Sequence, residues 1–173
     1  MTRNPTTSLP DTFWRWPLAI SLAVLLVDQL TKWFIIRTLR VGDRFHVFYD
    51  FFHVVHLRNT GAAWGLFQGY TLALTILSLA VLAVMIRFYQ YFVDHYNERA
   101  IALGLIVGGI LGNLTDRVFR GEVVDFLLFF YRSFQWPAFN VADSAITVGV
   151  TIFVLSSFIR ANEEKRRNEK QPA

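Results

Sequence analysis

Four long apolar runs alternate with more polar connections along the chain. They cover residues 16–36, 70–90, 100–117 and 141–160. Each run is close to the roughly 20 residues that an α-helix needs to cross the hydrocarbon core of a bilayer. The pattern therefore predicts a membrane protein that is mainly α-helical, with four transmembrane helices.

The connection at residues 37–69 has a different pattern from the apolar runs. Residues 45–59 are rich in Phe, Val, Tyr and His, and the sequence N-T-G at 59–61 is a turn signal. We expect short strands of a small extracytoplasmic β-sheet there, followed by a short helical piece at residues 62–67. The amide of Asn59 could reach a substrate backbone or stabilise the turn itself.

Two histidines, His53 and His56, lie within the predicted strands. Side chains an odd number of positions apart point to opposite faces of a strand. The two imidazoles are therefore not expected to chelate a metal together, and solvated or hydrogen-bonded roles are favoured.

Composition agrees with a membrane location. Hydrophobic residues make up 54% of the 173 residues, which is too many for an ordinary soluble domain, and there are 17 Phe and 5 Trp. Aromatic side chains gather in protein cores and at membrane interfaces. The chain has no cysteine, which excludes disulfides, thiolate metal sites and a cysteine nucleophile. Its length favours a single membrane-embedded domain over residues 1–173.

The net charge is +4, and five of the 17 basic residues fall in the last fourteen positions. A basic tail beside an apolar span is typical of the cytoplasmic side of a membrane protein. We therefore expect both termini in the cytoplasm and no nucleic-acid partner. The connections at residues 37–69 and 118–140 then lie outside.

Charged residues within the spans need partners, because a lone charge in hydrocarbon is costly. Asp28 and Lys32 are four residues apart and so share a helix face, which favours a structural ion pair. Asp116 lies near the end of its span and needs a cation or amide donors. Asn113 and Arg117 are its expected anchors.

Three glycines, Gly104, Gly108 and Gly112, recur every four residues in the third span. Small residues at this spacing allow another helix to approach closely. Packing against a neighbouring helix and close approach of a substrate backbone both remain open.

Two further carboxylates, Asp125 and Asp143, are expected at the outer membrane boundary. Asn140 is a suitable N-cap for the fourth span, and Asp143 would occupy position N3 of a capping box. A helix N-terminus stabilises negative charge, so we hypothesise that Asp143 is a general base and Asp125 a general acid, as in aspartic peptidases. The alternative is structural: a cap, and an ion pair with a nearby arginine such as Arg120.

Five segments of the chain carry a resemblance to a known family. They are D-Q-L-T-K at 28–32, R-N-T-G-A-A-W-G at 58–65, G-G-I-L-G-N-L-T-D-R at 108–117, V-V-D-F at 123–126 and F-N-V-A-D at 139–143. In this order they resemble the motif blocks of the bacterial lipoprotein signal peptidase family, signal peptidase II. One departure is a tryptophan at position 64, where the family pattern usually has phenylalanine.

The resemblance implies an aspartyl endopeptidase of the bacterial cytoplasmic (inner) membrane, built from four helices and a small extracytoplasmic sheet. The family removes signal peptides from prolipoproteins, cutting just before a cysteine that bears diacylglycerol. Asp125 and Asp143 match the catalytic pair, and Phe126 and Trp64 could wall the site. Matching positions that line or support the site are Asn59, Asn113, Asp116, Arg117 and Asn140. Gly108 and Gly112, from the glycine stripe, and Phe139, as a further wall residue, are added as candidates for substrate-binding or supporting roles.

The expected partners are diacylglyceryl prolipoproteins and membrane lipids, with the enzyme acting as a monomer. No metal or organic cofactor is implied. Two other classes remain open at the level of sequence. One is a proton-coupled carrier in which Asp28, Lys32 and Asp143 form a relay, and the other is a structural subunit whose polar groups are all paired for stability.

Overall fold

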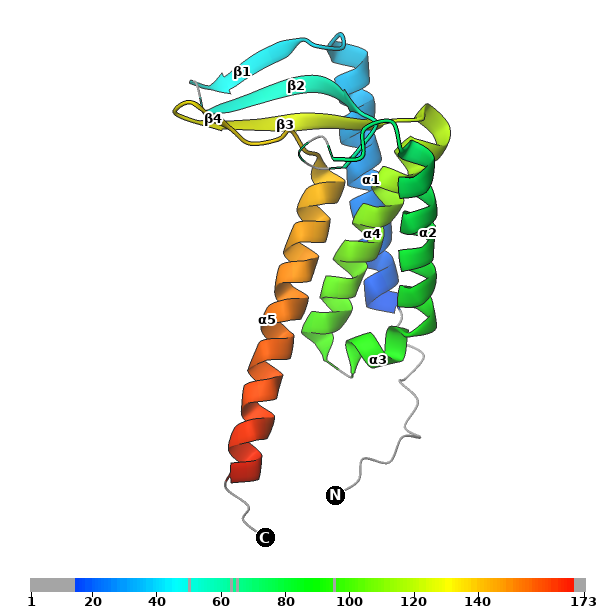
Figure 1. The fold of residues 1–173 in the computed structure, drawn as a ribbon, viewed down its shortest axis with the longest axis vertical. Helices are drawn as coiled ribbons and strands as arrows, with labels where there is room; N and C mark the ends of the chain where they lie inside the picture. The colour runs from blue at the N-terminus through cyan, green and yellow to red at the C-terminus, as the bar shows by residue number, and fades with distance from the viewer. Residues whose placement is uncertain (1–14, 50, 63, 65, 95, 170–173) are drawn as a thin grey trace.

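A bundle of helices with a small sheet across one end makes up the protein (Figure 1). The computed structural model describes residues 15–49, 51–62, 64, 66–94 and 96–169. Its helices are α1 (Arg15–Thr38), α2 (Thr71–Arg87), the short α3 (Tyr89–Val93), α4 (Asn97–Arg120) and α5 (Val141–Glu169). The start of α1 and the end of α5 both lie at the end of the bundle away from the sheet.

Three helices, α1, α4 and α5, are long and apolar enough to cross a membrane, and α2 is a shorter apolar helix of 17 residues. Many large apolar side chains on these helices point outward; Leu26, Leu72 and Phe158 are 60%, 73% and 67% exposed. Outward-facing apolar side chains are expected where lipid rather than water surrounds a helix. These features define a membrane protein.

The helices differ from the predicted spans mainly at their ends. The second ends at Arg87 instead of residue 90, and the fourth continues to Glu169. The extension of α5 is polar but consists mostly of good helix formers, so hydrophobicity alone does not mark its end. Helix α4 ends where Gly121 adopts a left-handed conformation with φ of 77°, as is common just after a helix.

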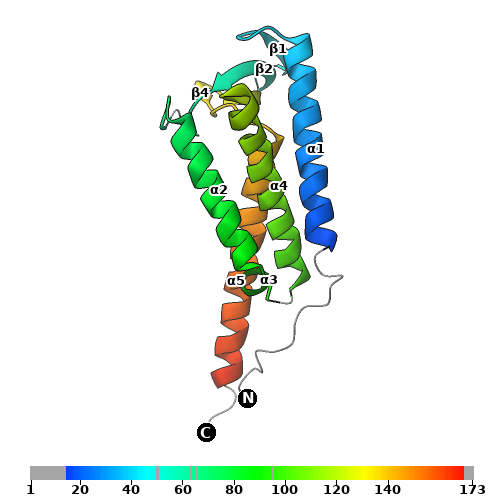
Figure 2. The same ribbon diagram turned by 90° about the vertical axis from the view of Figure 1, so that its right-hand side faces the viewer.

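Helix α4 is packed between α1 and α5 (Figures 1 and 2). A β-carbon added at Gly108 would lie 2.8 Å from the carbonyl oxygen of Ser21 on α1, and one at Gly104 would lie 2.9 Å from that of Pro17. Gly112 faces the carboxylate of Asp28 in the same way. The glycine stripe therefore serves close helix packing.

The sheet is antiparallel, with strands in the order β1-β2-β3-β4. Its strands are β1 (Arg44–Phe48), β2 (Phe52–Asn59), β3 (Val123–Tyr131) and β4 (Phe134–Gln135). The strands expected at residues 45–59 are confirmed. The described residues of the helical piece expected at 62–67 make turns instead, with 3₁₀ geometry at Trp64.

Both histidines of β2 are buried and hydrogen bonded. His56 Nδ1 lies 2.8 Å from the carbonyl oxygen of Leu39, and His53 Nε2 lies 3.3 Å from that of Tyr49. Their polar contacts thus tie the sheet to the end of α1 and to the β1–β2 turn, as expected for hydrogen-bonded histidines.

The sheet positions the segments that carry the two expected catalytic carboxylates. Strand β3 follows α4 almost directly and pairs with β2, so that Asp125 lies opposite Leu57. The chain then returns, and Phe139 pairs with Leu127 just before α5 begins. This return brings the start of α5 beside β3, although Asp125 and Asp143 lie on different elements.

Candidate active site

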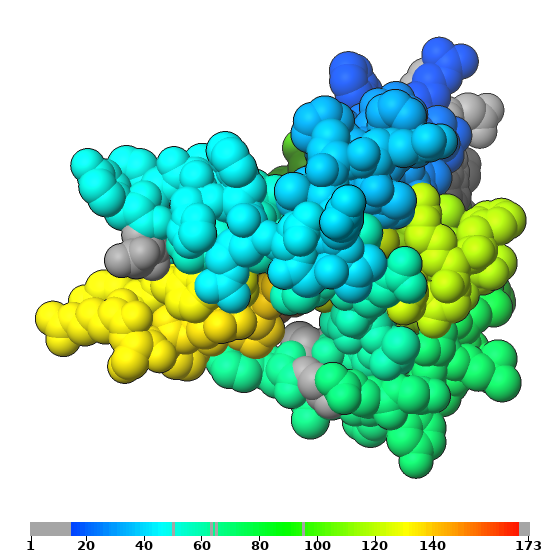
Figure 3. Space-filling model, turned by 90° about the horizontal axis from the view of Figure 1, so that it is seen from above, coloured from blue at the N-terminus to red at the C-terminus, as the bar shows by residue number. Residues whose placement is uncertain are grey.

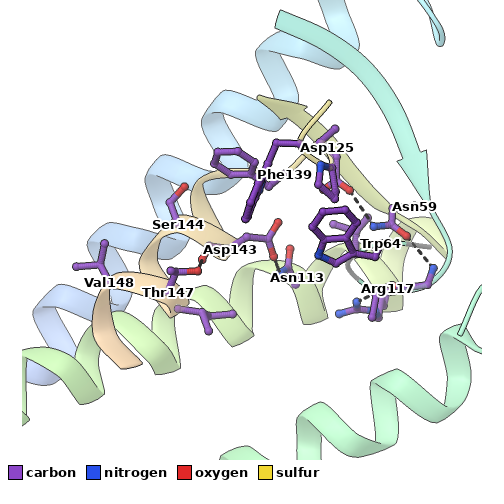
Figure 4. A pocket seen from close by; sticks show the side chains of 17 residues that line it. Asn59, Trp64, Asn113, Arg117, Asp125, Phe139, Asp143, Ser144, Thr147 and Val148 are labelled. Carbon is purple, nitrogen blue, oxygen red and sulfur yellow. Dashed lines mark hydrogen bonds between the residues drawn. The ribbon is translucent and has the colours of Figure 1, made fainter. Parts of the chain in front are cut away.

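A cavity of about 460 Å³ lies where the sheet meets the helices. It is lined by residues from the turn after β2, from α4, from β3 and from the first turns of α5. The side chains of Asp125 and Asp143 both line this cavity (Figure 4). The two carboxylates that the sequence singled out thus share one space.

Asp125 is buried on β3, with only 4% of its surface exposed. Its Oδ2 accepts a hydrogen bond of 2.9 Å from the side-chain amide of Asn59. Its Oδ1 accepts one of 2.8 Å from the amide of Asn140. Asn59 also accepts a hydrogen bond from the backbone N–H of Gly61, so it stabilises its own turn and holds the Asp125 carboxylate at the same time.

Asp143 lies in the first turn of α5, where the predicted capping box is confirmed. Its backbone N–H donates to Oδ1 of Asn140 at 3.0 Å, and the N–H of Asn140 donates to Oδ2 of Asp143 at 3.1 Å. The other carboxylate oxygen, Oδ1, accepts a hydrogen bond of 2.8 Å from the amide of Asn113 on α4.

The two asparagines also contact each other, because the Nδ2 of Asn140 donates to Oδ1 of Asn113 at 3.2 Å. Both asparagines are buried. An unbroken chain of side-chain hydrogen bonds therefore runs from Asp125 through Asn140 and Asn113 to Asp143. The chain fixes how each carboxylate is presented to the cavity.

A buried lysine lies behind this chain. The Nζ of Lys32 is 2.8 Å from Asp28 and 2.8 Å from Asp116, and it donates to Oδ1 of Asn113 at 3.2 Å. The side chains of all three charged residues are fully buried. The predicted ion pair between Asp28 and Lys32 is confirmed, and it belongs to a larger network.

The anchors expected for Asp116 were wrong. Its carboxylate pairs with Lys32 and with Arg120, and it accepts hydrogen bonds from Gln29 and from the backbone N–H of Val124. The two residues predicted for this role point elsewhere: one donates to Asp143 and the other lines the cavity. Asp116 therefore ties α4 to α1 and β3 and is absent from the cavity lining.

Burial and, to a lesser extent, the negative charge of Asp143 raise the pKa of Asp125 to about 7, against the lowering effect of the hydrogen bonds from Asn59 and Asn140. Desolvation disfavours the ionised carboxylate more than these donors stabilise it. Asp125 can therefore carry a proton near neutral pH, as a general acid must.

Arg117 supplies positive charge to the cavity wall. Its Nη2 donates to the carbonyl oxygen of Gly61 at 3.3 Å, while its buried Nε has no hydrogen-bond partner among the described residues. This guanidinium joins the loop after β2 to α4 at the wall of the cavity (Figure 4).

Aromatic side chains form much of the remaining wall. Phe139 and Trp64 line the cavity as expected. The expectation for Phe126 was wrong, because this side chain is buried in the core against Ile35 and Val124. Position 126 is adjacent to 125 on a strand, so it points to the opposite face.

Three of the eight predicted supporting residues are absent from the cavity lining and do not touch either carboxylate. Gly108 and Gly112 pack against α1, and Asp116 belongs to the lysine network. Sequence reasoning in turn missed Trp136 and Thr147, which do line the cavity. Thr147 lies one helical turn after Asp143, a spacing that could have identified it.

Comparisons with known proteins agree with this geometry. The family model described as Signal peptidase (SPase) II matches residues 20–159. The lipoprotein signal peptidase of Bacillus pumilus (strain SAFR-032) is 37% identical over 146 residues, which is 84% of this chain and 94% of that protein. That of Bacillus subtilis (strain 168) is 33% identical over 147 residues, or 85% of this chain and 96% of the relative.

Two solved structures of bacterial membrane enzymes are similar in fold. The first, determined by the in meso method at 2.3 Å resolution, has a TM-score of 0.80 and 33% identity, and covers 85% of this chain and 90% of its own. The second, at 1.9 Å resolution, has a TM-score of 0.74 and 34% identity, and covers 81% and 90%.

Fold, site and similarity together define a bacterial membrane enzyme, a peptidase of the aspartic type. This class excludes the two alternatives that the sequence left open, a proton-coupled carrier and a purely structural subunit. The chain belongs to the signal peptidase II family.

Proposed function

We propose that this enzyme removes signal peptides from diacylglyceryl-modified bacterial prolipoproteins, cutting just before the lipidated cysteine. Relatives that match over more than four fifths of the chain are named lipoprotein signal peptidases. The observation that carries the proposal is that Asp125 and Asp143 line one cavity and are joined through Asn140 and Asn113. This arrangement suits hydrolysis of an amide by water without a covalent enzyme intermediate.

In the first step, the ionised carboxylate of Asp143 takes a proton from a water molecule. The water oxygen forms a bond to the carbonyl carbon of the residue before the cysteine. Protonated Asp125 gives its proton to the carbonyl oxygen, so the tetrahedral intermediate is neutral. The pKa of about 7 for Asp125 and the position of Asp143 at a helix N-terminus support this division of roles.

In the second step, the roles of the two carboxyl groups exchange. Asp143, now protonated, gives its proton to the amide nitrogen of the cysteine, and the carbon–nitrogen bond breaks. Asp125 takes a proton back from one hydroxyl of the intermediate as the new carboxyl group forms. Both side chains end in their starting protonation states, and the pair titrates as a unit.

The supporting residues have distinct proposed tasks. Asn59 and Asn140 orient the carboxylate of Asp125, and Asn113 orients that of Asp143. Arg117 has a buried Nε without a hydrogen-bond partner among the described residues, and it is suited to donate a hydrogen bond to a carbonyl oxygen of the substrate backbone.

We further propose that α2 crosses the membrane together with α1, α4 and α5, that both termini are cytoplasmic, and that the site faces outward. Four traverses agree with the start of α1 and the end of α5 lying at one end of the bundle. The cavity then lies at the outer boundary of the membrane, where the scissile bond of a lipidated cysteine is expected. A single copy, surrounded by membrane lipids, contains every residue assigned here.

The test is cleavage by the purified full chain in lipid nanodiscs. The substrate is a diacylglyceryl-modified prolipoprotein, and the unmodified precursor is the control. Mass spectrometry should find a new N-terminus at the lipidated cysteine only. Asp125→Asn and Asp143→Asn should each abolish the product, whereas Asp43→Asn, a change outside the cavity, should not. Full cleavage by either aspartate variant would overturn the proposed mechanism. Absence of cleavage by the parent enzyme would overturn the proposed substrate.

A further inference from the structure

A second cavity, of about 310 Å³, adjoins the active site on the sheet. All seven side chains that line it are aromatic: Phe51, the residues at 129–131, Phe134, Trp136 and Phe139. We call it the aromatic trough. Trp136 and Phe139 also line the active-site cavity, so the two spaces meet at these side chains.

The trough leads away from the carboxylate pair along strand β3. The residues at 129–131, which line the trough, follow Asp125 on the same strand. At roughly 3.3 Å per residue, the six steps from Asp125 to Tyr131 span about 20 Å. Seen from above, β1, β2 and the β3–β4 hairpin project to one side of the helices (Figure 3).

The lining of the trough identifies the kind of group that it can bind. It contains no charged side chain, and its backbone is already paired: Phe130 N–H donates to Phe51 O at 2.8 Å, and Trp136 N–H donates to Phe129 O at 2.9 Å. A bound peptide segment would bury N–H and C=O groups without partners, which is unfavourable. A hydrocarbon chain has no such groups and gains from leaving water.

We propose that the aromatic trough binds one acyl chain of the diacylglyceryl group on the substrate cysteine. This inference rests on the proposed function. The lipidated cysteine directly follows the scissile bond. When the carbonyl group of the scissile bond lies at Asp125, the lipid must therefore leave the active-site cavity near this residue. Trp136 and Phe139, shared by both spaces, are the point of exit. An acyl chain held in the trough fixes the position of the scissile bond along the sheet.

The proposal is tested with two synthetic lipopeptides of the same sequence, one with palmitoyl chains and one with hexanoyl chains. The enzyme is the full chain in nanodiscs. The variant is Phe51→Gln with Phe134→Gln, because these two trough side chains are 49% and 48% exposed and not needed for the core. Phe48→Gln is the matched control, since Phe48 is 60% exposed on β1 and lies outside the trough.

The parent enzyme should prefer the palmitoyl substrate in kcat/KM, since each buried methylene contributes up to about fourfold. The double variant should lower the palmitoyl-to-hexanoyl ratio about tenfold or more, mainly through KM. Phe48→Gln should keep the parent ratio. Cleavage by all three proteins with the same ratio would overturn the trough while leaving the proposed function standing. Absence of cleavage by the parent enzyme would count against the proposed function itself.

Cross-linking gives a second readout that does not depend on turnover. A palmitoyl substrate with a diazirine at the end of its chain is bound to the Asp125→Asn variant and irradiated. Adducts are expected on β3 and β4, and unlabelled substrate should compete them away. Adducts confined to the helices would overturn the proposal. Equal labelling of the same strands by a diazirine phospholipid, without competition from substrate, would show that bulk lipid occupies the trough and would also overturn it.

Discussion

Asp28 on α1 accepts a hydrogen bond of 2.9 Å from the backbone N–H of Ala142, in the first turn of α5. Ala142 directly precedes Asp143 in the chain. The first helix therefore holds the very turn that presents one carboxylate of the pair. The ion pair between Asp28 and Lys32 thus has a consequence for the site as well as for stability.

Asp28→Leu should destabilise the enzyme by about 3–5 kcal/mol, because it removes one partner of a fully buried ion pair. It should also lower kcat, since the start of α5 loses a side-chain acceptor. The measurements are thermal unfolding in detergent and single-turnover cleavage. The double variant Asp28→Leu/Lys32→Met should recover part of the stability, because no buried ammonium is then left short of a partner. If the double variant is no more stable than the single one, the loss of the Lys32 contact to Asp116 outweighs the removal of the unpaired ammonium. If Asp28→Leu alone leaves stability and kcat unchanged, the ion pair has neither role.

Activity should fall as the pH rises through about 7. The proposed acid, Asp125, must be protonated in the free enzyme, and its pKa is about 7. The kcat/KM profile should therefore decline on the alkaline side of this value, about tenfold per pH unit. Asn59→Ser removes a hydrogen bond that stabilises the ionised form, so the alkaline limb should move to higher pH. If the alkaline limb of Asn59→Ser stays at the parent pH, Asp125 is not the group whose titration causes the decline.

The raised pKa of Asp125 also predicts how stability changes with pH. Between about pH 4 and pH 7 the carboxyl group is ionised in the unfolded chain but protonated in the folded one. The folded state then binds more protons, so its stability falls as the pH rises through this window and levels off above pH 7. The Asp125→Asn variant lacks this loss. The difference in free energy of unfolding between the variant and the parent should therefore grow with pH in favour of the variant, by at most about 4 kcal/mol. Thermal unfolding of both proteins across the window measures it.

Substitutions of Asn140 can separate its helix cap from its contact with Asp125. Serine is also a good N-cap residue, so Asn140→Ser should keep the hydrogen bond to the N–H of Asp143 but lose the amide that donates to Asp125. We expect kcat to fall roughly tenfold to a hundredfold. The free energy of unfolding should fall by about 1–3 kcal/mol, because buried acceptors on Asp125 and Asn113 lose their donor. Asn140→Ala should lose both the cap and this donor. If the serine variant and the parent have equal kcat, the hydrogen bond from the Asn140 amide to Asp125 does not contribute to catalysis.

Gly108→Ala should destabilise the contact between α1 and α4. The added β-carbon would lie 2.8 Å from the carbonyl oxygen of Ser21, and such overpacking costs about 1–3 kcal/mol, more than the helix propensity gained, about 1 kcal/mol. Val118→Ala, on an exposed position of the same helix, is the control. Unfolding in detergent compares the two. A Gly108→Ala enzyme more stable than its parent would mean that α1 can move away without loss.

The sequence was sufficient to predict the long helices and the capping box, because both depend on residues close together in the chain. Apolar runs mark the helices, and Asn140 and Asp143 are three positions apart. The strand β3 could not be predicted in the same way. Its nine residues, V-V-D-F-L-L-F-F-Y, show no alternation, since much of the strand is covered on both faces, and an unbroken apolar run does not distinguish strand from helix.

Partners from distant parts of the sequence were the other limit. Lys32 neutralises Asp116 across more than eighty positions, and no local spacing indicates such a contact. The local candidates for this role therefore failed. The same reason explains why Trp136 was missed, because it reaches the cavity only after β3 and β4 pair.

Because the left-handed turn at Gly121 is short, the number of residues between α4 and β3 determines which way Asp125 points. Only this short turn separates the helix that carries Asn113 from the strand that carries Asp125. One residue inserted between Gly121 and β3 would shift the strand by one position and turn every side chain to the opposite face. Asp125 would then point away from Asp143, with both carboxylates still in the sequence. Natural length variation in related enzymes should therefore avoid this connection and occur instead at the tip of the β3–β4 hairpin.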